Sequence, residues 1–124
     1  MSLPAKSRYT IFEAAKYIAA AYGQPVNAGQ VLDWGAQGSY RLHLSVTRCT
    51  VRRDGKTETL KDALVEVRPN TEQAAMLARG ERISATHCWR DGDEWEFVRQ
   101  RTGDYTGWTG DTVYFGTAAL ALLV

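Results

Sequence analysis

Cysteine is scarce in this chain of 124 residues, since Cys49 and Cys88 are its only two and they form no CxxC pair. This count does not favour a disulfide scaffold, and we expect two buried free thiols in a reducing compartment. Long hydrophobic runs are also missing: the longest, residues 118–124, is far shorter than the roughly 20 residues that cross a bilayer. With no secretory leader at the start, the sequence predicts a cytoplasmic protein without a membrane partner.

Net charge is low as well, at +1, but it is unevenly distributed. Residues 1–53 contain seven bases and two acids, a net charge of +5, whereas residues 54–124 contain eight bases and twelve acids, a net charge of −4. The hydrophobic content of 44% is near the globular average and excludes general disorder. The split predicts that the N-terminal portion faces a polyanion.

Motifs for catalysis are absent: the chain has no glycine-rich phosphate loop, no GxSxG elbow and no recognisable triad. We therefore expect no enzymatic activity, no catalytic residue and no cofactor. A zinc site built from His43, Cys49, His87 and Cys88 is also not expected, because structural zinc sites usually include two ligands two to four residues apart on a turn. The acids around Asp91 are typical of a hairpin turn.

Two helices are expected near the N-terminus. Thr10 and Glu13 form a capping-box pattern, and apolar residues then recur at helical spacing at Ile11, Ala14, Ala15, Ile18 and Tyr22 before Gly23. Asn27 can cap a second helix that ends near Gly38.

The remaining pattern predicts mostly strands. Apolar and polar residues alternate from Tyr40 to Thr47, residues 52–56 have the composition of a hairpin turn, and a return strand follows, with residues 64–67 as a third strand. Residues 72–79 indicate a short helix, residues 83–97 a second hairpin, residues 102–110 a loop or distorted hairpin arm, and residues 113–115 a strand before a helical turn capped by Thr117.

Residues 9–44 resemble the helix-turn-helix start of excisionase-like and MerR-like proteins, such as small proteins of prophages and integrated elements. The resemblance depends on Glu13-Ala14-Ala15 in the first helix, a second helix closed by Gly38, and a strand in the place of the wing. It implies a small DNA-binding accessory or regulatory protein, acting as a dimer on double-stranded DNA.

In that family the second helix enters the major groove and the wing contacts phosphates. The implied base-reading residues are Asn27, Gln30 and Gln37, and the implied phosphate contacts are Arg41, His43, Arg48, Arg52 and Arg53. Residues 27–38 contain no Lys or Arg and include Asp33, so this helix has a net charge of −1 beside an anionic surface. Phosphate contact through the basic strand is therefore the stronger expectation.

A second hypothesis is a non-enzymatic protein-interaction module that keeps a helix-turn-helix scaffold. Aromatic residues are frequent in the acidic portion, and Trp95, Tyr105 and Trp108 are the candidate contacts for a protein partner.

The expected fold class is α+β, with an N-terminal helix-turn-helix unit packed on a mainly antiparallel sheet of four to six strands. Residues 1–53 would form the helix-turn-helix with its basic wing-like strand. Residues 54–124 would form the aromatic-rich, acidic portion that shares one core with it.

Overall fold

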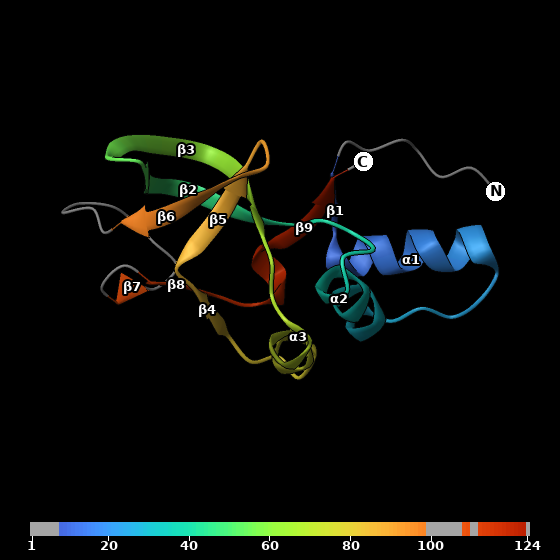
Figure 1. Ribbon diagram of the computed structural model, residues 1–124. Helices are drawn as coiled ribbons and strands as arrows, with labels where there is room; N and C mark the ends of the chain where they lie inside the picture. Colours follow the sequence, from blue (N-terminus) through green and yellow to red (C-terminus); the bar gives the residue numbers. More distant parts are fainter. Residues whose placement is uncertain (1–7, 99–107, 110–111, 124) are drawn as a thin grey trace.

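The computed structural model describes residues 8–98, 108–109 and 112–123 (Figure 1). The helices are α1 (Ile11–Tyr22), α2 (Ala28–Ala36) and α3 (Thr71–Ala78), with a 3-10 turn η1 (Thr117–Ala119). The strands are β1 (Arg8–Thr10), β2 (Leu42–Arg53), β3 (Lys56–Val67), β4 (Ile83–Ala85), β5 (His87–Arg90), β6 (Asp93–Val98), β7 (Trp108–Thr109), β8 (Thr112–Phe115) and β9 (Leu120–Leu123). The fold class is α+β, as the sequence predicts.

Each of the three α-helices starts with a reciprocal capping box. In α1 the Glu13 amide donates to the Thr10 hydroxyl and the Thr10 amide donates to the Glu13 carboxylate, both at 3.1 Å. Asn27 and Asn70 cap α2 and α3 in the same way. Gly23, with a φ of 67°, ends α1 in the left-handed conformation that glycine tolerates best. The starts expected for the first two helices are confirmed.

The helix α2 lies between α1 and α3 (Figure 1), and its Gly35 lies against Leu42 of β2. Val31 and Leu32 are fully buried. A Cβ atom placed on Gly35 would come within 2.7 Å of Leu42, so glycine is what lets the helix approach β2 this closely. The second helix of the helix-turn-helix unit is thus an interior element of the molecule.

The long β2–β3 hairpin organises the six-stranded antiparallel sheet, whose order is β1-β9-β2-β3-β5-β6. Along the edge of β2 that β3 does not occupy, β9 pairs with residues 42–44 and β6 pairs with residues 50–52. The return of β6 to β2 closes β2, β3, β5 and β6 into a small barrel. Its interior contains Cys49, Val51, Cys88 and Phe97, each at most 1% exposed. The two free, buried cysteines agree with the sequence prediction.

The buried positions of β2 change phase halfway along the strand. Leu42, Leu44 and Val46 are buried beside the helical end, two exposed residues follow, and burial resumes at Cys49 and Val51 inside the barrel. On β3 the residue opposite this break, Asp62, has a φ of +46°. The hairpin therefore serves two packing environments, one with the helices and β9, the other with β5 and β6.

Two strand predictions need correction. Residues 64–67 are not a separate strand but the end of β3, which runs unbroken from the hairpin turn. The expected strand before Asp91 is split at Thr86 into β4 and β5, because β4 pairs with β8 in a separate three-stranded sheet of order β4-β8-β7. The β5–β6 hairpin itself is confirmed.

The C-terminal apolar segment is a strand that the sequence analysis missed. Thr117 starts a 3-10 turn, and its hydroxyl donates to the Leu77 carbonyl at 2.9 Å. After that turn β9 runs between β1 and β2, with Leu120 and Leu122 buried. Of residues 102–110, expected as a loop or a distorted hairpin arm, only Trp108 and Thr109 lie in the described ranges, as β7, which pairs antiparallel with β8.

The buried side chains from both halves of the chain form one hydrophobic cluster. The boundary at residue 53 falls at the tip of the β2–β3 hairpin, where the two strands pair along their whole length. Among the described helices none is long and apolar enough to span a membrane.

Candidate nucleic-acid interface

The tip half of the β2–β3 hairpin brings two cations directly opposite each other. Arg48 on β2 pairs with Lys61 on β3 in the strand register, and both side chains are exposed. Neither forms an ion pair with any of the residues that the structure describes. Like charges directly opposite in a sheet destabilise it, so this pair opposes folding unless an anion lies nearby.

Two hydroxyls extend this positive site along the hairpin. Thr50 and Thr59 are the next pair on the same side of the strands, and their Oγ1 atoms lie 3.4 Å apart. Directly opposite residues on antiparallel strands share a face, and residues two apart on one strand do too. We call Arg48, Thr50, Thr59 and Lys61 the hairpin patch. Cationic and hydroxyl side chains are typical donors to phosphate oxygens.

Arg52 and Arg53, at the tip, already have carboxylate partners. The Arg52 Nη2 lies 2.9 Å from Glu96 Oε2, and the Arg53 Nη1 lies 3.2 Å from Asp93 Oδ1. Both acids belong to β6, and both pairs are roughly half exposed. Exposed pairs of this kind contribute about 0–1 kcal/mol, but they neutralise the two arginines expected to contact phosphate.

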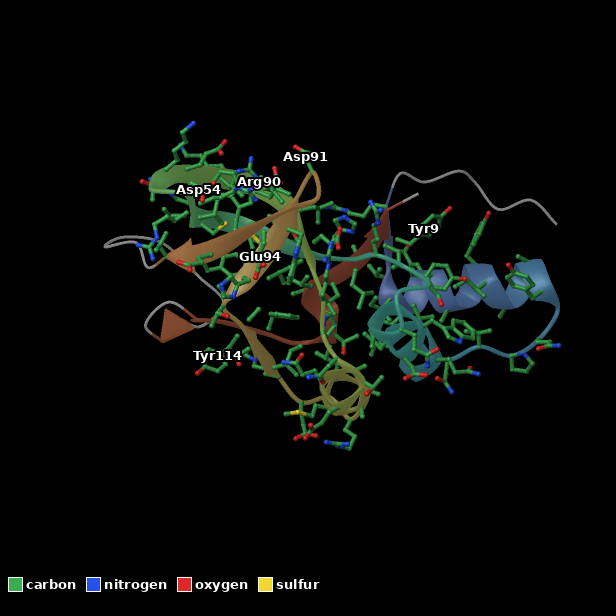
Figure 2. All side chains as sticks on the ribbon, in the orientation of Figure 1. Tyr9, Asp54, Arg90, Asp91, Glu94 and Tyr114 are labelled. Carbon is green, nitrogen blue, oxygen red and sulfur yellow. The ribbon has the colours of Figure 1, made fainter. Side chains whose placement is uncertain are left out.

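These arginines border a cavity of about 390 Å³ in which acids predominate. Its lining comprises Arg52, Arg53, Asp54, Gly55, His87, Glu94 and Glu96. Glu94, labelled in Figure 2, also lines a neighbouring pocket together with residues of β4 and β8. The sequence assigned this acidic cluster to a hairpin turn and did not predict that it would meet the basic hairpin. The carboxylates of Asp54, Glu94 and Glu96 therefore disfavour the binding of a phosphate in this cavity.

The expected base-reading residues of α2 are occupied within the helix. Asn27 and Gln30 form its capping box, with both amide-to-side-chain hydrogen bonds at 2.9 Å. The Gln37 Nε2 donates to Asp33 Oδ2 at 2.8 Å. Because their amide groups satisfy local partners, none of the three side chains projects an unused donor and acceptor pair toward a base edge.

Arg41 and His43 lie at the helical end of β2, away from the tip. Arg41 is exposed and lines an apolar groove beside α1. His43 is half-buried, and its Nδ1 has no hydrogen-bond partner among the described residues. Figure 1 shows the hairpin tip and α1 at opposite ends of the molecule, with α2 between α1 and α3. The expected groove-reading helix and phosphate-binding wing therefore do not form one continuous surface.

The candidate protein contacts in the acidic portion are placed as follows. Trp95 is half-buried against the core, with the Arg90 guanidinium 4.9 Å from its ring centre. Tyr105 lies outside the described residues, and of Trp108 the structure gives the backbone, in β7.

Sequence reasoning missed the exposed aromatic side chains of α1. Phe12 is 58% exposed, Tyr17 is 40% exposed and Tyr22 is 73% exposed. Tyr22 was expected on the buried stripe, and its angular position agrees with that, but it is the last residue of α1 and projects beyond the packed layer. Phe12 and Tyr17 do not share the helical face formed by the buried residues of α1. Their position outside that face is the signal that could have identified them as exposed.

Four groups in the small barrel have shifted pKa values, and one of them is Arg90, whose pKa is raised by its hydrogen bond to Glu58. The hydrogen bond and positive charge of Arg90 lower the pKa of the Glu58 carboxyl, whose Oε2 lies 2.6 Å from Arg90 Nη1. Burial raises the pKa of the Cys49 thiol to about 11. Burial, together with Cys49, raises the pKa of the Cys88 thiol to about 12. None of these groups has the environment of an activated nucleophile.

Among the described residues, no three His, Cys, Asp or Glu side chains are grouped closely enough to hold a metal ion. No protein family model, no curated protein and no solved structure matches this chain.

Proposed function

We propose that this protein binds the phosphate backbone of double-stranded DNA through the hairpin patch, as a small accessory or regulatory protein. The observation that supports the proposal is the pair of exposed, directly opposed cations, Arg48 and Lys61, with no carboxylate partner among the described residues. A cross-strand pair of like charges destabilises the sheet. A phosphate bound between the Arg48 guanidinium and the Lys61 ammonium group would remove this repulsion.

The proposed contact does not depend on the base sequence. Phosphate contacts position a protein on the duplex, whereas specificity needs side chains at base edges. The helix α2 is packed between α1 and α3, has no basic residue, and uses Asn27 and Gln30 to cap itself. The DNA-binding role is therefore assigned to the hairpin, and α2 is assigned a scaffold role.

The test measures binding to a labelled 20-base-pair duplex of random sequence by fluorescence anisotropy between about 50 and 200 mM salt. The variant Arg48→Ala/Lys61→Ala should reduce the slope of log affinity against log salt by roughly 2, because each phosphate contact contributes about 0.9. The control Lys16→Ala/Arg82→Ala removes two exposed cations elsewhere and changes net charge equally; its slope should remain that of the wild type. Absence of wild-type binding at 50 mM salt, or equal losses in both variants, would refute the proposal.

A protein-interaction role is favoured by a separate observation, the exposed aromatic residues of α1. They lie at the opposite end of the molecule from the hairpin tip (Figure 1). The two roles use different surfaces, so one chain can perform both.

A further inference from the structure

Two apolar grooves border the C-terminal half of α1 and meet at shared residues. The first, of about 420 Å³, lies between α1 and strands β1 and β9, with Tyr9, Tyr17 and Leu122 among its lining residues. The second, of about 370 Å³, lies between α1 and α2, with Val26 and Trp34 among its lining residues. Ile18, Tyr22 and Tyr40 line both.

The lining of these grooves is mostly aromatic and aliphatic. The rings of Tyr9 and Tyr17 lie 5.2 Å apart, and those of Trp34 and Tyr40 lie 6.2 Å apart. Figure 2 shows Tyr9 at the junction of β1 and α1. Tyr22, between the two grooves, is 73% exposed. Exposed aromatic side chains next to a preformed apolar concavity are typical of the centre of a binding site.

The single positive charge in the described lining of the two grooves indicates which kind of partner they can bind. Arg41 is the one charged residue in the described lining of either groove, and no carboxylate lines them. It is exposed and forms no ion pair with a described residue. A partner that places an anionic group against Arg41 and an apolar side chain between Tyr17 and Tyr22 matches both features.

Other occupants match these features less well. In a second copy of this chain, the matching surface would bring a second Arg41 and no compensating acid from the groove. A single-stranded nucleic acid carries one phosphate per nucleotide and is usually bound along a groove with several cations, whereas Arg41 is the single cation in the described lining of the two grooves.

We infer that the α1 groove, defined by Tyr9, Tyr17, Ile18, Tyr22, Tyr40 and Arg41, binds an acidic peptide segment of a partner protein through an aromatic or aliphatic anchor. The inference is independent of the DNA-binding proposal, because it uses other residues at the other end of the molecule.

The test uses two six-residue peptides, the acidic GEFWEG and its basic counterpart GKFWKG, titrated into isotopically labelled protein to millimolar concentration and followed by amide chemical shifts. We expect saturable shifts at Tyr22, Tyr40 and Arg41 with the acidic peptide and at least tenfold weaker binding of the basic one. The substitution Arg41→Glu should reverse that preference, and Tyr22→Ala should weaken both peptides. Both positions are exposed, so the variants should keep the wild-type melting temperature.

A matched control is Arg82→Glu, which reverses an exposed charge far from the grooves and should leave the acidic-peptide affinity unchanged. Absence of saturable shifts with the acidic peptide, or a preference that survives Arg41→Glu, would overturn the inference. Tighter binding of an oligothymidylate at the same residues would assign the groove to nucleic acid instead. Concentration-dependent dimerisation abolished by Tyr22→Glu would assign it to a second copy.

Discussion

Arg90 shows how one side chain can connect several strands of the small barrel. Its guanidinium donates to both carboxylate oxygens of Glu58 on β3, at 2.6 and 3.3 Å, and lies 4.9 Å from the ring centre of Trp95 on β6. A bidentate pair of this kind is more directional than an ordinary surface ion pair. Arg90 therefore fastens β5 to the neighbours on both of its sides.

The Glu58–Arg90 pair predicts a pH dependence of stability. Because the folded-state pKa of Glu58 is lowered from the ordinary value of 4.5, the pair stabilises the fold above that pH, and the contribution is lost as the pH falls through the lowered folded-state pKa. The variant Glu58→Gln should therefore have a lower urea midpoint than the wild type at pH 7, and the gap should close in acid. Arg90→Gln should lower the urea midpoint at pH 7 in the same way. The double variant should be little less stable than either single variant, because both remove the same interaction. A gap that persists unchanged at pH 3 would contradict this account.

The two cysteines predict an unreactive native state. Both thiols are fully buried, and burial raises their pKa values to about 11 and about 12, so almost no thiolate is present at pH 8. Because the thiolate is the nucleophile, iodoacetamide should modify neither Cys49 nor Cys88 in the native protein over an hour, as measured by mass spectrometry. Both should react rapidly in guanidinium. Labelling of either thiol without unfolding would show that the barrel opens.

For single residues, the sequence predicted the element in which a side chain lies better than the partner that it contacts. That Arg48 and Arg52 lie on one basic strand follows from local alternation. That Arg52 meets Glu96 depends on strand pairing across 44 positions, which no local pattern encodes. The Arg48–Lys61 pair, in contrast, follows from the register that the two-residue turn at Asp54-Gly55 sets for the hairpin. The capping role of Asn27 was predictable because its partner is three residues away.

The β2–β3 hairpin is the element in which the proposed function and stability oppose each other. Lys61→Glu would replace a like-charge pair with an opposite pair across from Arg48. We expect the free energy of unfolding to rise by roughly 0.2–1 kcal/mol, while the affinity for duplex DNA falls. Urea unfolding and anisotropy on the same samples measure the two effects.

A neutral substitution, Lys61→Gln, controls for loss of the lysine side chain itself. It should fall between the wild type and Lys61→Glu in both measurements. A variant that loses stability and keeps its affinity for DNA would argue against both the charge repulsion and the proposed contact.

Elements were predictable where their signals are local. The capping boxes, the glycine after α1 and the turn at Asp54-Gly55 each act within a few residues, and α1, α2 and the β2–β3 turn were expected correctly. The strand β9 was missed because residues 120–123 are apolar throughout. A strand covered on both faces has no alternation to distinguish it from a buried helical turn.

For the whole molecule, β9 is the element that joins the two ends of the described chain. It lies between β1 and β2, and Leu120 and Leu122 belong to the common core. Deleting residues 120–124 should therefore abolish cooperative thermal unfolding, since β1 loses its partner and the helices lose part of their floor. Circular dichroism and amide dispersion would measure this.

A milder variant makes the deletion interpretable. Leu122→Ala should leave the protein folded but reduce its stability by about 2–5 kcal/mol, the usual effect of truncating a buried leucine. Native-like dispersion in the deleted chain would show that the remaining core is sufficient without β9.

The α+β class and a shared core could be predicted from periodicity and composition, but the global arrangement could not. Closure of β6 onto β2 and the separation of the hairpin tip from α2 depend on pairings between distant segments. For this reason Arg52 and Arg53, at the tip of the expected wing, lie away from α2, although β2 begins beside that helix.

The position of β9 also affects how the protein is made. A ribosome synthesises α1 and α2 about a hundred residues before the strand that completes the sheet beneath α1. Until that strand emerges from the exit tunnel, α1 lacks its contacts with β9. The native packing of α1 should therefore form only after β9 has been synthesised, and a chain arrested before β9 should be recognised by chaperones and proteases through its exposed first helix.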